Sequence, residues 1–468
     1  MIQFNNPLLE QIGICAEQLN LDCYVVGGWV RDSLLGVSSN DIDIVCVNRN
    51  GSLVKRPGIY LAEHIAGQFP GSEVKIYKNY GTAQLKLGDI ELEFVGARKI
   101  SYPRDGSADI IEDGTLLDDL LRRDFSINSI AISLNPKNYG EVFDPFGGLN
   151  DIKDKIIRTV NSSLTFLDDP LRILRAIRFA AKYHFIIEDS TRKFAQDLSG
   201  NLYNVARERI NGELDKIMSL PQPSIGWCIL DNTKILSIVF PELLDLKETS
   251  VIDGRKHKDI FAHSLQVLDN VAKVSDNLWL RWAALLHDIG KPKCKAWIDG
   301  VGWTFRDHAI IGSRLIPDLF KKYKFPQNEK MDFVVKMVFL HMRPIHLVEE
   351  GVTDSAIRRI LFDAGDDIDS LMILCDADVT SKNAAKVERI HNNYQLLKTR
   401  IIELEESDRI RNFQPQLDGQ EIMRIFNLTP GPKVGELKKR LKDAILDGVI
   451  SNTKEESIEY LKKLNPYN

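Results

Sequence analysis

The stretch YVVGGWVRDSLLG (residues 24–36), followed by SSNDIDIV (residues 38–45), decides the fold of the N-terminal part. An apolar run enters Gly27 and Gly28, and a helical pattern begins directly after them, which predicts a strand-to-helix turn. Glycines at such a turn let backbone N–H groups approach a ligand, and the start of a helix adds partial positive charge. The turn therefore predicts a phosphate site, with Arg31 as a nearby cation, although a pair of glycines alone also fits an ordinary turn.

Two carboxylates, Asp41 and Asp43, lie two residues apart in the next predicted strand. Residues i and i+2 of a strand point to the same face, so these side chains repel each other unless a cation lies between them. Mg²⁺ prefers one or two carboxylates together with substrate phosphates. The sequence therefore predicts a Mg²⁺ site that activates an attacking hydroxyl and stabilises a leaving pyrophosphate.

A third carboxylate is available on the later strand IELEFV (residues 90–95), where Glu91 and Glu93 alternate. We favour Glu93 as a catalytic residue, because the FVGAR that follows keeps the strand apolar. The alternative is a row of solvent-facing acids on an edge strand.

The sequence pattern changes from mixed strand and helix signals to mostly helical signals near residue 170. Before it, β-rich runs alternate with helical patterns, which predicts an α+β domain around a small sheet: CYVV (23–26), DIDIVCV (41–47), AQLKL (83–87) and IELEFV (90–95). After it, apolar residues recur at helical spacing, so the remainder is predicted to be mostly α-helical.

Length and charge limit the possible functions. The 468 residues suffice for several domains, and the net charge of −5 argues against a protein that holds nucleic acid by bulk positive charge. Residues 170–210 nevertheless carry eight Lys or Arg against four Asp or Glu, which predicts a local cationic patch. The six cysteines form no C-x-x-C pair, and no apolar run reaches the roughly 20 residues of a membrane span, so we expect a cytoplasmic protein.

Arginines mark the candidate nucleotide contacts. Arg122 and Arg123 precede a segment with a mixed helical pattern, and arginine binds phosphate through its bidentate fork. Arg172, Arg175 and Arg178 recur every three residues, which places them within an arc of about 120° on one helix face. Asp169 and Arg172 together form an acceptor and donor pair that can hydrogen-bond a base edge.

The strings VVGGWVRDSLLG, DID, LLRRDFSINSIAI, DPFGGLND and DDPLRILRAIRF, in this order, resemble the bacterial-type CCA-adding enzymes (tRNA nucleotidyltransferases) and the related bacterial poly(A) polymerases. The resemblance implies a polymerase-β-like head (1–150), a helical neck that binds the base and RNA (151–225), a body (226–390) and a tail that contacts tRNA (391–468). It implies template-independent addition of C, C and A to tRNA from CTP and ATP. The alternative is a poly(A) polymerase.

The resemblance also implies roles for single residues. It assigns Asp41 and Asp43 as the metal ligands. Residues expected at the nucleotide are Gly27, Gly28, Arg31, Arg123, Asp124, Asn128, Asp169, Arg172, Arg175 and Arg178. Asp169 and Arg172 match the E-D-x-x-R motif with which such enzymes read C or A, but Asp168 stands where that motif has Glu.

A second constellation lies downstream, with His263 in FAHSLQVLDN, His287 and Asp288 in LRWAALLHDIGKP, and Asp378 in LCDADVTSKN. Imidazole and carboxylate together bind a transition metal or Mg²⁺, which activates water on a phosphoester. The order H, HD, D resembles the HD-type phosphohydrolases over about residues 255–385.

The HD resemblance implies a metal-dependent phosphohydrolase activity. It places His308 and His341 where binuclear members hold a second metal ion. Asp376 competes with Asp378 as the last ligand of the first ion, and we favour Asp378 because the family pattern is Ala followed by Asp.

Other function classes fit less well. Uridylyltransferases of nitrogen regulation and alarmone synthetase-hydrolases also combine these two modules, but neither carries the DDPLR segment. An RNA-binding protein without catalysis is disfavoured because both sets of metal ligands are complete.

Overall fold

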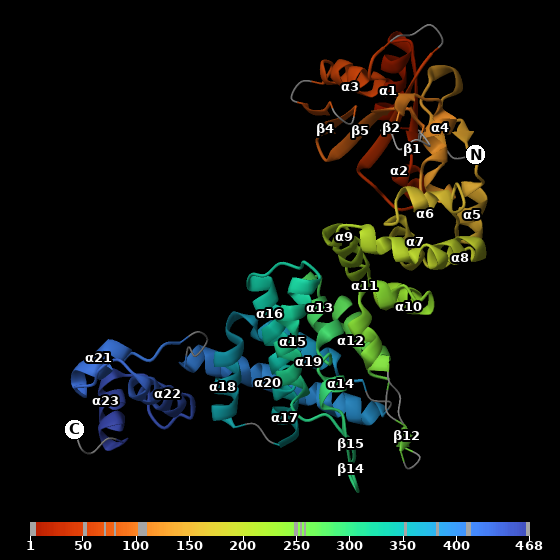
Figure 1. Cartoon of the computed structure of the whole chain (residues 1–468). Coiled ribbons are helices and arrows are strands. Elements are labelled where there is room, and N and C mark those ends of the chain that lie inside the picture. Colours follow the sequence, from red (N-terminus) through yellow and green to blue (C-terminus); the bar gives the residue numbers. More distant parts are fainter. Residues whose placement is uncertain are drawn as a thin grey trace. The chain divides into compact units, whose positions relative to one another are not determined.

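The computed structural model describes residues 6–49, 54–69, 72–78, 81–101, 110–247, 251–252, 255–256, 259–350, 353–380, 383–408 and 413–464. Two units can be distinguished. The first comprises Met1–Glu213 and Cys228–Val239, and the second Leu214–Trp227 and Phe240–Asn468. The first unit contains a sheet with helices and the second is mostly helical (Figure 1), so the predicted fold class is confirmed. The bounds of the four predicted domains stay a prediction.

A seven-stranded mixed sheet with the order β3-β4-β5-β2-β1-β8-β9 organises the first unit. Its strands are β1 Leu21–Val26, β2 Asp41–Asn48, β3 Glu73–Tyr77, β4 Thr82–Leu87, β5 Ile90–Gly96, β8 Ala131–Ser133 and β9 Val142–Phe143. The central strands β2 and β5 are parallel, with Asp43 opposite Glu93 and Asp41 opposite Glu91. On the side of β2 away from β5, strand β1 pairs antiparallel with β2. All four predicted strands are present, and their register brings the carboxylates of two strands together.

The two faces of this sheet differ because side chains alternate along each strand. Ile44 and Phe94 lie in the main core, to which α1 (Pro7–Gln18) and α3 (Pro57–Ala66) contribute. Val45 lies in a smaller core on the opposite face, together with Leu120 of α4 (Leu116–Leu121). By the same alternation, Asp43 and Glu93 belong to this second face, where the smaller core leaves room for a polar site.

The prediction of a helix after Arg122 and Arg123 is wrong. Helix α4 ends before them, and only a 3-10 turn, Ser126–Asn128, follows. The chain then enters β8, which pairs antiparallel with β1. Pairing at the free side of β1 satisfies the backbone hydrogen bonds of this apolar segment, so the sheet overrides its helical pattern.

Helices complete the first unit. They are α2 Gly28–Leu34, α5 Gly148–Asp154, α6 Leu164–Asp168, α7 Arg172–Tyr183, α8 Asp189–Asp197, α9 Arg207–Met218, α10 Ser224–Asn232 and α11 Leu236–Val239, of which α9 and α10 belong partly to the second unit. Helix α7 has the two faces that its sequence predicts. Ile173, Leu174 and Ile177 are buried, whereas its arginines line a cavity.

The second unit is built from helices around α13. Its main helices are α12 Ile260–Ala272, α13 Leu278–Leu286, α14 Lys291–Cys294, α15 His308–Lys322, α16 Glu329–Leu340, α17 Arg343–Glu350, α18 Asp354–Ala364, α19 Ile368–Ala377 and α20 Ala384–Asp408. Helices α12, α16 and α19 all pack against α13. A short hairpin, β14 (Ala296–Ile298) and β15 (Gly302–Thr304), joins α14 to α15. This packing brings the ends of several helices to one place.

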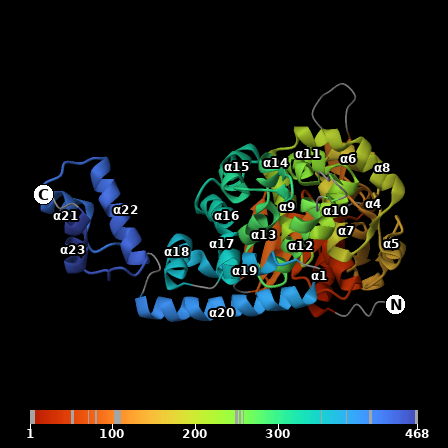
Figure 2. The same cartoon turned by 90° about the horizontal axis from the view of Figure 1, so that it is seen from below.

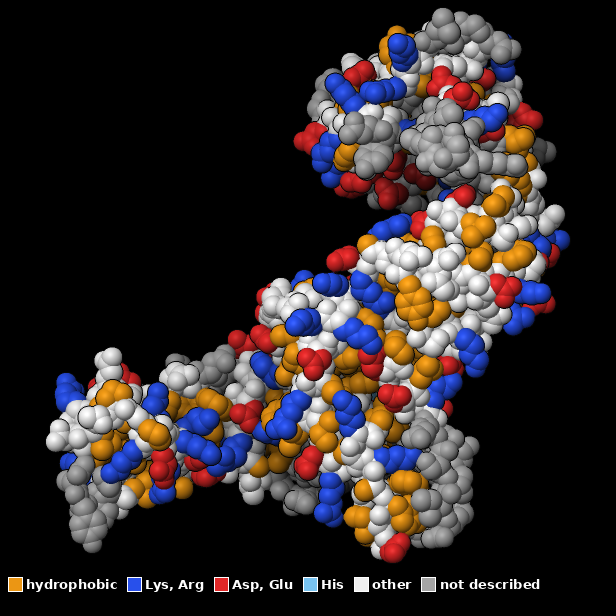
Figure 3. Space-filling model, viewed as in Figure 1, with side chains coloured by type: hydrophobic (Ala, Val, Ile, Leu, Met, Phe, Trp, Pro, Cys, Tyr) orange, Lys and Arg blue, Asp and Glu red, His pale blue; other side chains and the backbone are white. Residues whose placement is uncertain are grey.

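The C-terminal helices form a separate small core. Helices α21 (Gly419–Ile425), α22 (Pro432–Leu446) and α23 (Lys454–Leu464) pack around Leu441 and Leu461 (Figure 2). Lys and Arg side chains are spread over this part of the surface (Figure 3). Among the described helices, none has the length and apolar character needed to cross a membrane.

Candidate functional site

A cavity of about 890 Å³ opens on the carboxylate-bearing face of the sheet in the first unit. Nine Arg or Lys side chains line it against five Asp or Glu, so its lining has an excess of positive charge. The predicted residues among this lining are Gly27, Gly28, Arg31, Asp43, Glu93, Arg123, Asp124, Asn128, Asp169, Arg172, Arg175 and Arg178. The cavity thus gathers residues from far-apart motifs and fits a polyanionic ligand.

Asp41 is placed differently. It is exposed at the start of β2 and borders a neighbouring open groove together with Lys86 and Glu91. Its charge still reaches the cavity, because it helps to raise the pKa values of Asp43 and Glu93.

The turn before α2 requires glycine. Gly27 has a φ of 74°, which side chains rarely adopt. A Cβ atom there would lie 2.6 Å from Nη1 of Arg123 and 2.9 Å from Oδ2 of Asp43. The missing side chain therefore keeps the floor of the cavity open between a cation and a carboxylate.

Asp43 and Glu93 fit a divalent cation. Burial raises the pKa of Asp43, the charge of Asp41 adds to the rise, and Arg123 opposes it. Burial also raises the pKa of Glu93, and the charge of Asp43 adds to this effect. Oxygen ligands that repel each other in a partly dry site are stabilised by a hard cation such as Mg²⁺.

Several of the expected nucleotide contacts are hydrogen-bonded to one another. Arg31 Nη1 donates to Asn128 Oδ1 at 2.5 Å, and Asn128 Nδ2 donates to Asp124 Oδ1 at 2.8 Å. Arg175 Nε donates to the other oxygen of Asp124 at 2.7 Å. Burial alone would raise the pKa of Asp124, but Arg175 and Asn128 outweigh it and hold the pKa below its usual value. These contacts tie α2 and the 3-10 turn to α7.

A second set of contacts joins α2 to α7. Arg31 Nε donates to Asp32 Oδ1 at 2.9 Å, and the hydroxyl of Tyr183 donates to the same oxygen at 2.7 Å. The Arg31 guanidinium lies 4.9 Å from the ring centres of both Phe179 and Tyr183. Arg31 therefore holds the strand-to-helix turn against the helix that carries Arg172, Arg175 and Arg178. Phe179 and Lys182 are not among the predicted residues, although they follow Arg175 and Arg178 by four residues, which places them on the same helix face.

We expect Arg175→Met to lower the free energy of unfolding by about 3 kcal/mol at pH 7, because it leaves the buried Asp124 carboxylate without its cation. The pKa of Asp124 is lowered in the folded state, so the pair stabilises the fold above the ordinary carboxyl pKa of about 4. This stability is lost as the pH falls through the lower folded value. Urea unfolding at several pH values measures it.

Arg192→Met is the matched control, because Arg192 pairs with the exposed Asp189 on α8. Its effect should stay within about 0.5 kcal/mol. Equal unfolding midpoints for the two variants would show that the Asp124 pair does not hold α7 in place.

Asp169 and Arg172 are both fixed beside the cavity. Asp169 accepts from Arg209 Nη2 at 2.8 Å through Oδ2 and from the Leu171 N–H at 3.1 Å through Oδ1. Arg172 donates to the backbone carbonyl of Arg122 at 2.8 Å. An acceptor and a donor side by side complement a base edge that presents an amino group next to a ring nitrogen.

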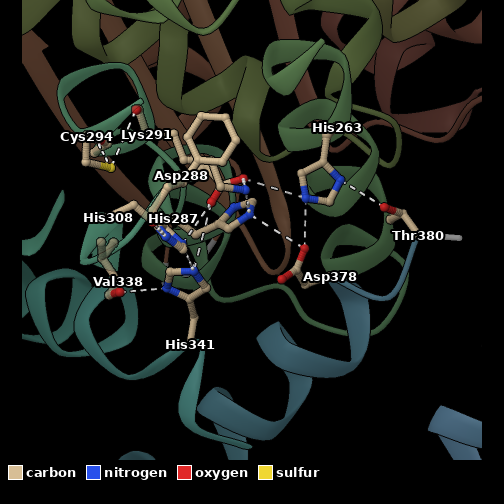
Figure 4. A network of polar contacts seen from close by, with 12 residues as sticks. His263, His287, Asp288, Lys291, Cys294, His308, Val338, His341, Asp378 and Thr380 are labelled. Carbon is tan, nitrogen blue, oxygen red and sulfur yellow. Dashed lines mark hydrogen bonds and ion pairs between the residues drawn. The ribbon is translucent and has the colours of Figure 1, made fainter. Parts of the chain in front are cut away.

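Six residues of the second unit converge in two groups of candidate metal ligands (Figure 4). The first group is His263, His287 and Asp378, and the second is Asp288, His308 and His341. His263 lies in α12, His308 begins α15, and the others follow the ends of α13, α16 and α19. The helix ends thus bring together residues more than 100 positions apart, as the H, HD, D order predicts.

The two groups adjoin each other at Asp288. Its Oδ2 lies 3.3 Å from His287 Nε2 and 3.8 Å from His263 Nε2, and its Oδ1 lies 3.5 Å from His308 Nε2. Lys291, which the sequence did not single out, lies 2.5 Å from Asp288 Oδ2. Asp288 therefore faces ligands of both groups.

Three of the histidines are oriented by backbone carbonyls. The Nδ1 atoms of His287, His308 and His341 lie 2.7–2.8 Å from the carbonyls of Ala284, Phe305 and Val338. A carbonyl only accepts, so each Nδ1 carries a proton, and when the ring is neutral its lone pair is on Nε2, the atom that a metal ion can bind.

This arrangement fits metal ions. Nε2 of His308 and Nε2 of His341 lie 3.2 Å apart, and burial lowers the pKa of both rings, that of His341 to about 4. Two facing lone pairs repel each other unless a cation lies between them. Within the described residues, the buried His287 Nε2 and Asp288 Oδ1 have no hydrogen-bond partner. Orphaned ligand atoms of this kind are expected where an ion binds.

Asp378 and Asp376 lie in different surroundings. Asp378 Oδ1 is 2.8 Å from His263 Nε2. Burial alone would raise the pKa of the Asp378 carboxyl, but His263 and His287 lower it to about 2. Asp376 instead pairs with Nδ1 of His391 at 2.5 Å. The structure therefore brings Asp378 into the first group, as the sequence interpretation prefers.

Comparison with known proteins gives three domain matches. Residues 23–158 match the family described as "Poly A polymerase head domain" and residues 184–246 match "Probable RNA and SrmB- binding site of polymerase A". Residues 260–383 match the "HD domain". The first match covers the carboxylate-bearing strands, and the last covers all six candidate ligands of the second unit.

Individual proteins are similar over longer stretches. The A-adding tRNA nucleotidyltransferase of Aquifex aeolicus is 42% identical over 196 residues, which are 42% of this chain but only 23% of that relative. The multifunctional CCA protein of Shewanella frigidimarina is 33% identical over 378 residues, 77% of this chain and 84% of that protein. A solved tRNA nucleotidyltransferase, complexed with a primer tRNA and an incoming ATP analog, has 26% identity and a TM-score of 0.57, covering 84% of this chain and 99% of its own.

The site geometry and these similarities agree. The cationic cavity is lined by residues of the matched head domain and of the segment 169–182 that follows it, and the metal-ligand groups lie within the HD domain. The chain belongs to the family of tRNA nucleotidyltransferases and poly(A) polymerases.

Proposed function

We propose that the protein adds C, C and A to the 3′ end of tRNA, using CTP and ATP and releasing pyrophosphate. The observation that carries this proposal is the cavity that joins the carboxylates Asp43 and Glu93 to the base-reading pair Asp169 and Arg172. The name of the Shewanella relative supports CCA addition, and the tRNA in the similar solved structure supports the substrate. The cytoplasm is the proposed location.

The carboxylates would hold Mg²⁺ in the first unit. Asp43 and Glu93, joined by Asp41 from the start of the same strand as Asp43, would supply oxygen ligands, and bound Mg²⁺ would lower the pKa of the attacking 3′ hydroxyl and offset phosphate charge. Gly27 and Gly28 leave room for the triphosphate, and the excess of cations in the lining balances its charge. A bond forms between the 3′ oxygen and the α-phosphorus, and the bond to the β-phosphate oxygen breaks, so pyrophosphate leaves.

The protein itself would select the base. Cytosine and adenine both present an amino group beside an unprotonated ring nitrogen. The Asp169 carboxylate would accept from the amino group, and the Arg172 guanidinium would donate to the ring nitrogen. Guanine and uracil present a carbonyl beside an N–H, which opposes this order of donor and acceptor. One pair of side chains therefore serves both CTP and ATP.

A second candidate is addition of the terminal A alone, because the Aquifex relative is named an A-adding enzyme. Two tRNA substrates separate the candidates, one ending at the discriminator base and one ending in CC, each given CTP or ATP separately. For a CCA-adding enzyme we expect two C residues on the first substrate and one A on the second. Activity with ATP on the CC-ended tRNA alone would establish A addition, and long A tails would establish a poly(A) polymerase.

We propose further that the HD domain is a metal-dependent phosphohydrolase that acts on phosphoesters such as 2′,3′-cyclic phosphates. His263, His287 and Asp378 would hold one ion and Asp288, His308 and His341 a second. Imidazole-rich sites of this kind suit Ni²⁺, Zn²⁺ or Fe²⁺ better than Mg²⁺. A metal ion there would activate water for attack on the phosphoester.

A further inference from the structure

His263 differs from the other histidines of the HD site in the partner of its Nδ1 atom. The Nδ1 atoms of His287, His308 and His341 lie against backbone carbonyls, whereas Nδ1 of His263 lies 2.9 Å from the hydroxyl of Thr380 (Figure 4). A carbonyl only accepts a hydrogen bond, but a hydroxyl either donates or accepts. Thr380 thus imposes no single tautomer on His263.

Both hydrogen-bonding directions are needed at this ring. Nε2 of His263 lies 2.8 Å from Oδ1 of Asp378, the distance of a hydrogen bond, and such a bond forms when Nε2 carries the proton and no metal ion takes its place. Nδ1 of the neutral ring then has a lone pair that accepts from the Thr380 hydroxyl. To bind a metal through Nε2, the ring must carry its proton on Nδ1 instead. The hydroxyl then rotates and accepts, and the ring does not have to move.

We propose that Thr380 is a positioning residue of the HD metal site, whose hydroxyl holds the His263 ring in both the metal-free and the metal-binding tautomer. This inference rests on the proposed hydrolase function. It deepens that function, because it makes the affinity of the ion held by His263, His287 and Asp378 depend on a side chain that is not itself a ligand. Partners of this kind typically change metal affinity 10–100-fold.

Calorimetric titration of the full-length, metal-free protein with Ni²⁺ tests the proposal. Excess Mg²⁺ in the buffer occupies the carboxylate site of the first unit, which prefers a hard cation. Thr380→Val keeps the shape of the side chain but removes the hydroxyl, and we expect one Ni²⁺ to bind at least about tenfold more weakly. The affinity of the other Ni²⁺ should not change, because its ligands His308 and His341 are oriented by the carbonyls of Phe305 and Val338 instead of by Thr380.

Two further variants act as controls. Thr380→Ser retains the hydroxyl and should restore the wild-type affinity. Thr399→Val removes a hydroxyl that lies on α20 and donates to the carbonyl of Gln395, four residues earlier, so it should have no effect. The melting temperatures of the metal-free proteins show whether each variant folds.

The outcomes separate the inference from the proposed function. Unchanged Ni²⁺ affinities in Thr380→Val would overturn the inference but leave the hydrolase proposal intact. Equal weakening in Thr380→Ser would also overturn it, because the loss would then arise from packing. A wild-type protein that binds no Ni²⁺ would overturn the hydrolase proposal and the inference with it.

Discussion

Replacing Asp43 with alanine should lower the rate of nucleotide addition about a thousandfold, with the fold retained. Asp43 lies within the cavity, opposite Glu93 in the paired strands and beside the space that Gly27 keeps open. Its removal would take away a ligand of the proposed Mg²⁺, and metal-ion catalysis contributes several kcal/mol to such reactions. The initial rate with ATP and a CC-ended tRNA measures the effect.

Glu91→Ala is a matched control for Asp43→Ala. Glu91 belongs to the same face of β5 as Glu93 but is exposed and lies outside the cavity lining. Its loss should leave the rate close to that of the wild type, whereas Glu93→Ala should reduce it strongly. A Glu91 variant as impaired as the Asp43 variant would move the proposed third ligand from Glu93 to Glu91.

Much of the head could be predicted from its sequence because the signals there are local. Apolar runs bounded by Gly, Asn and Asp predict the central strands, and the i, i+2 spacing of Asp41 and Asp43 places them on one face. The segment around Ile130 was predicted wrongly as helical because pairing of β8 with β1 is a non-local contact. The local spacing of apolar residues does not indicate which strand of the sheet has a free edge.

The composition of the two sites was easier to predict than their internal contacts. The motifs indicate Arg31, Asp124, Asn128 and Arg175 as nucleotide contacts, but the structure shows that these side chains also bind one another. Arg98 and Arg209 line the same cavity. No sequence motif indicates that Arg98 belongs to the site, because only folding brings this residue to the cavity. The hydroxyl beside His263 also lies 117 residues away in the sequence.

Asp288→Asn should abolish metal-dependent phosphoester hydrolysis, with a loss of about a thousandfold or more. The two Asp288 oxygens face His287 and His263 on one side and His308 and His341 on the other. Asparagine replaces one oxygen by an amide nitrogen that only donates, so one of the two ions loses a ligand and the other loses a negative charge. Hydrolysis of a 2′,3′-cyclic nucleotide in the presence of Ni²⁺ measures the activity.

Asp376→Asn tests the specificity of this effect, because it makes the same chemical change two residues from Asp378. Its carboxylate pairs with His391 and belongs to neither ligand group, so hydrolysis should persist. Nucleotide addition should persist in both variants, since its cavity lies in the first unit. Asp43→Ala should show the reverse pattern, losing addition and keeping hydrolysis. If Asp288→Asn reduced both activities equally, the two sites would not be independent, and the loss of hydrolysis would have to be attributed to the fold instead of to a missing metal ligand.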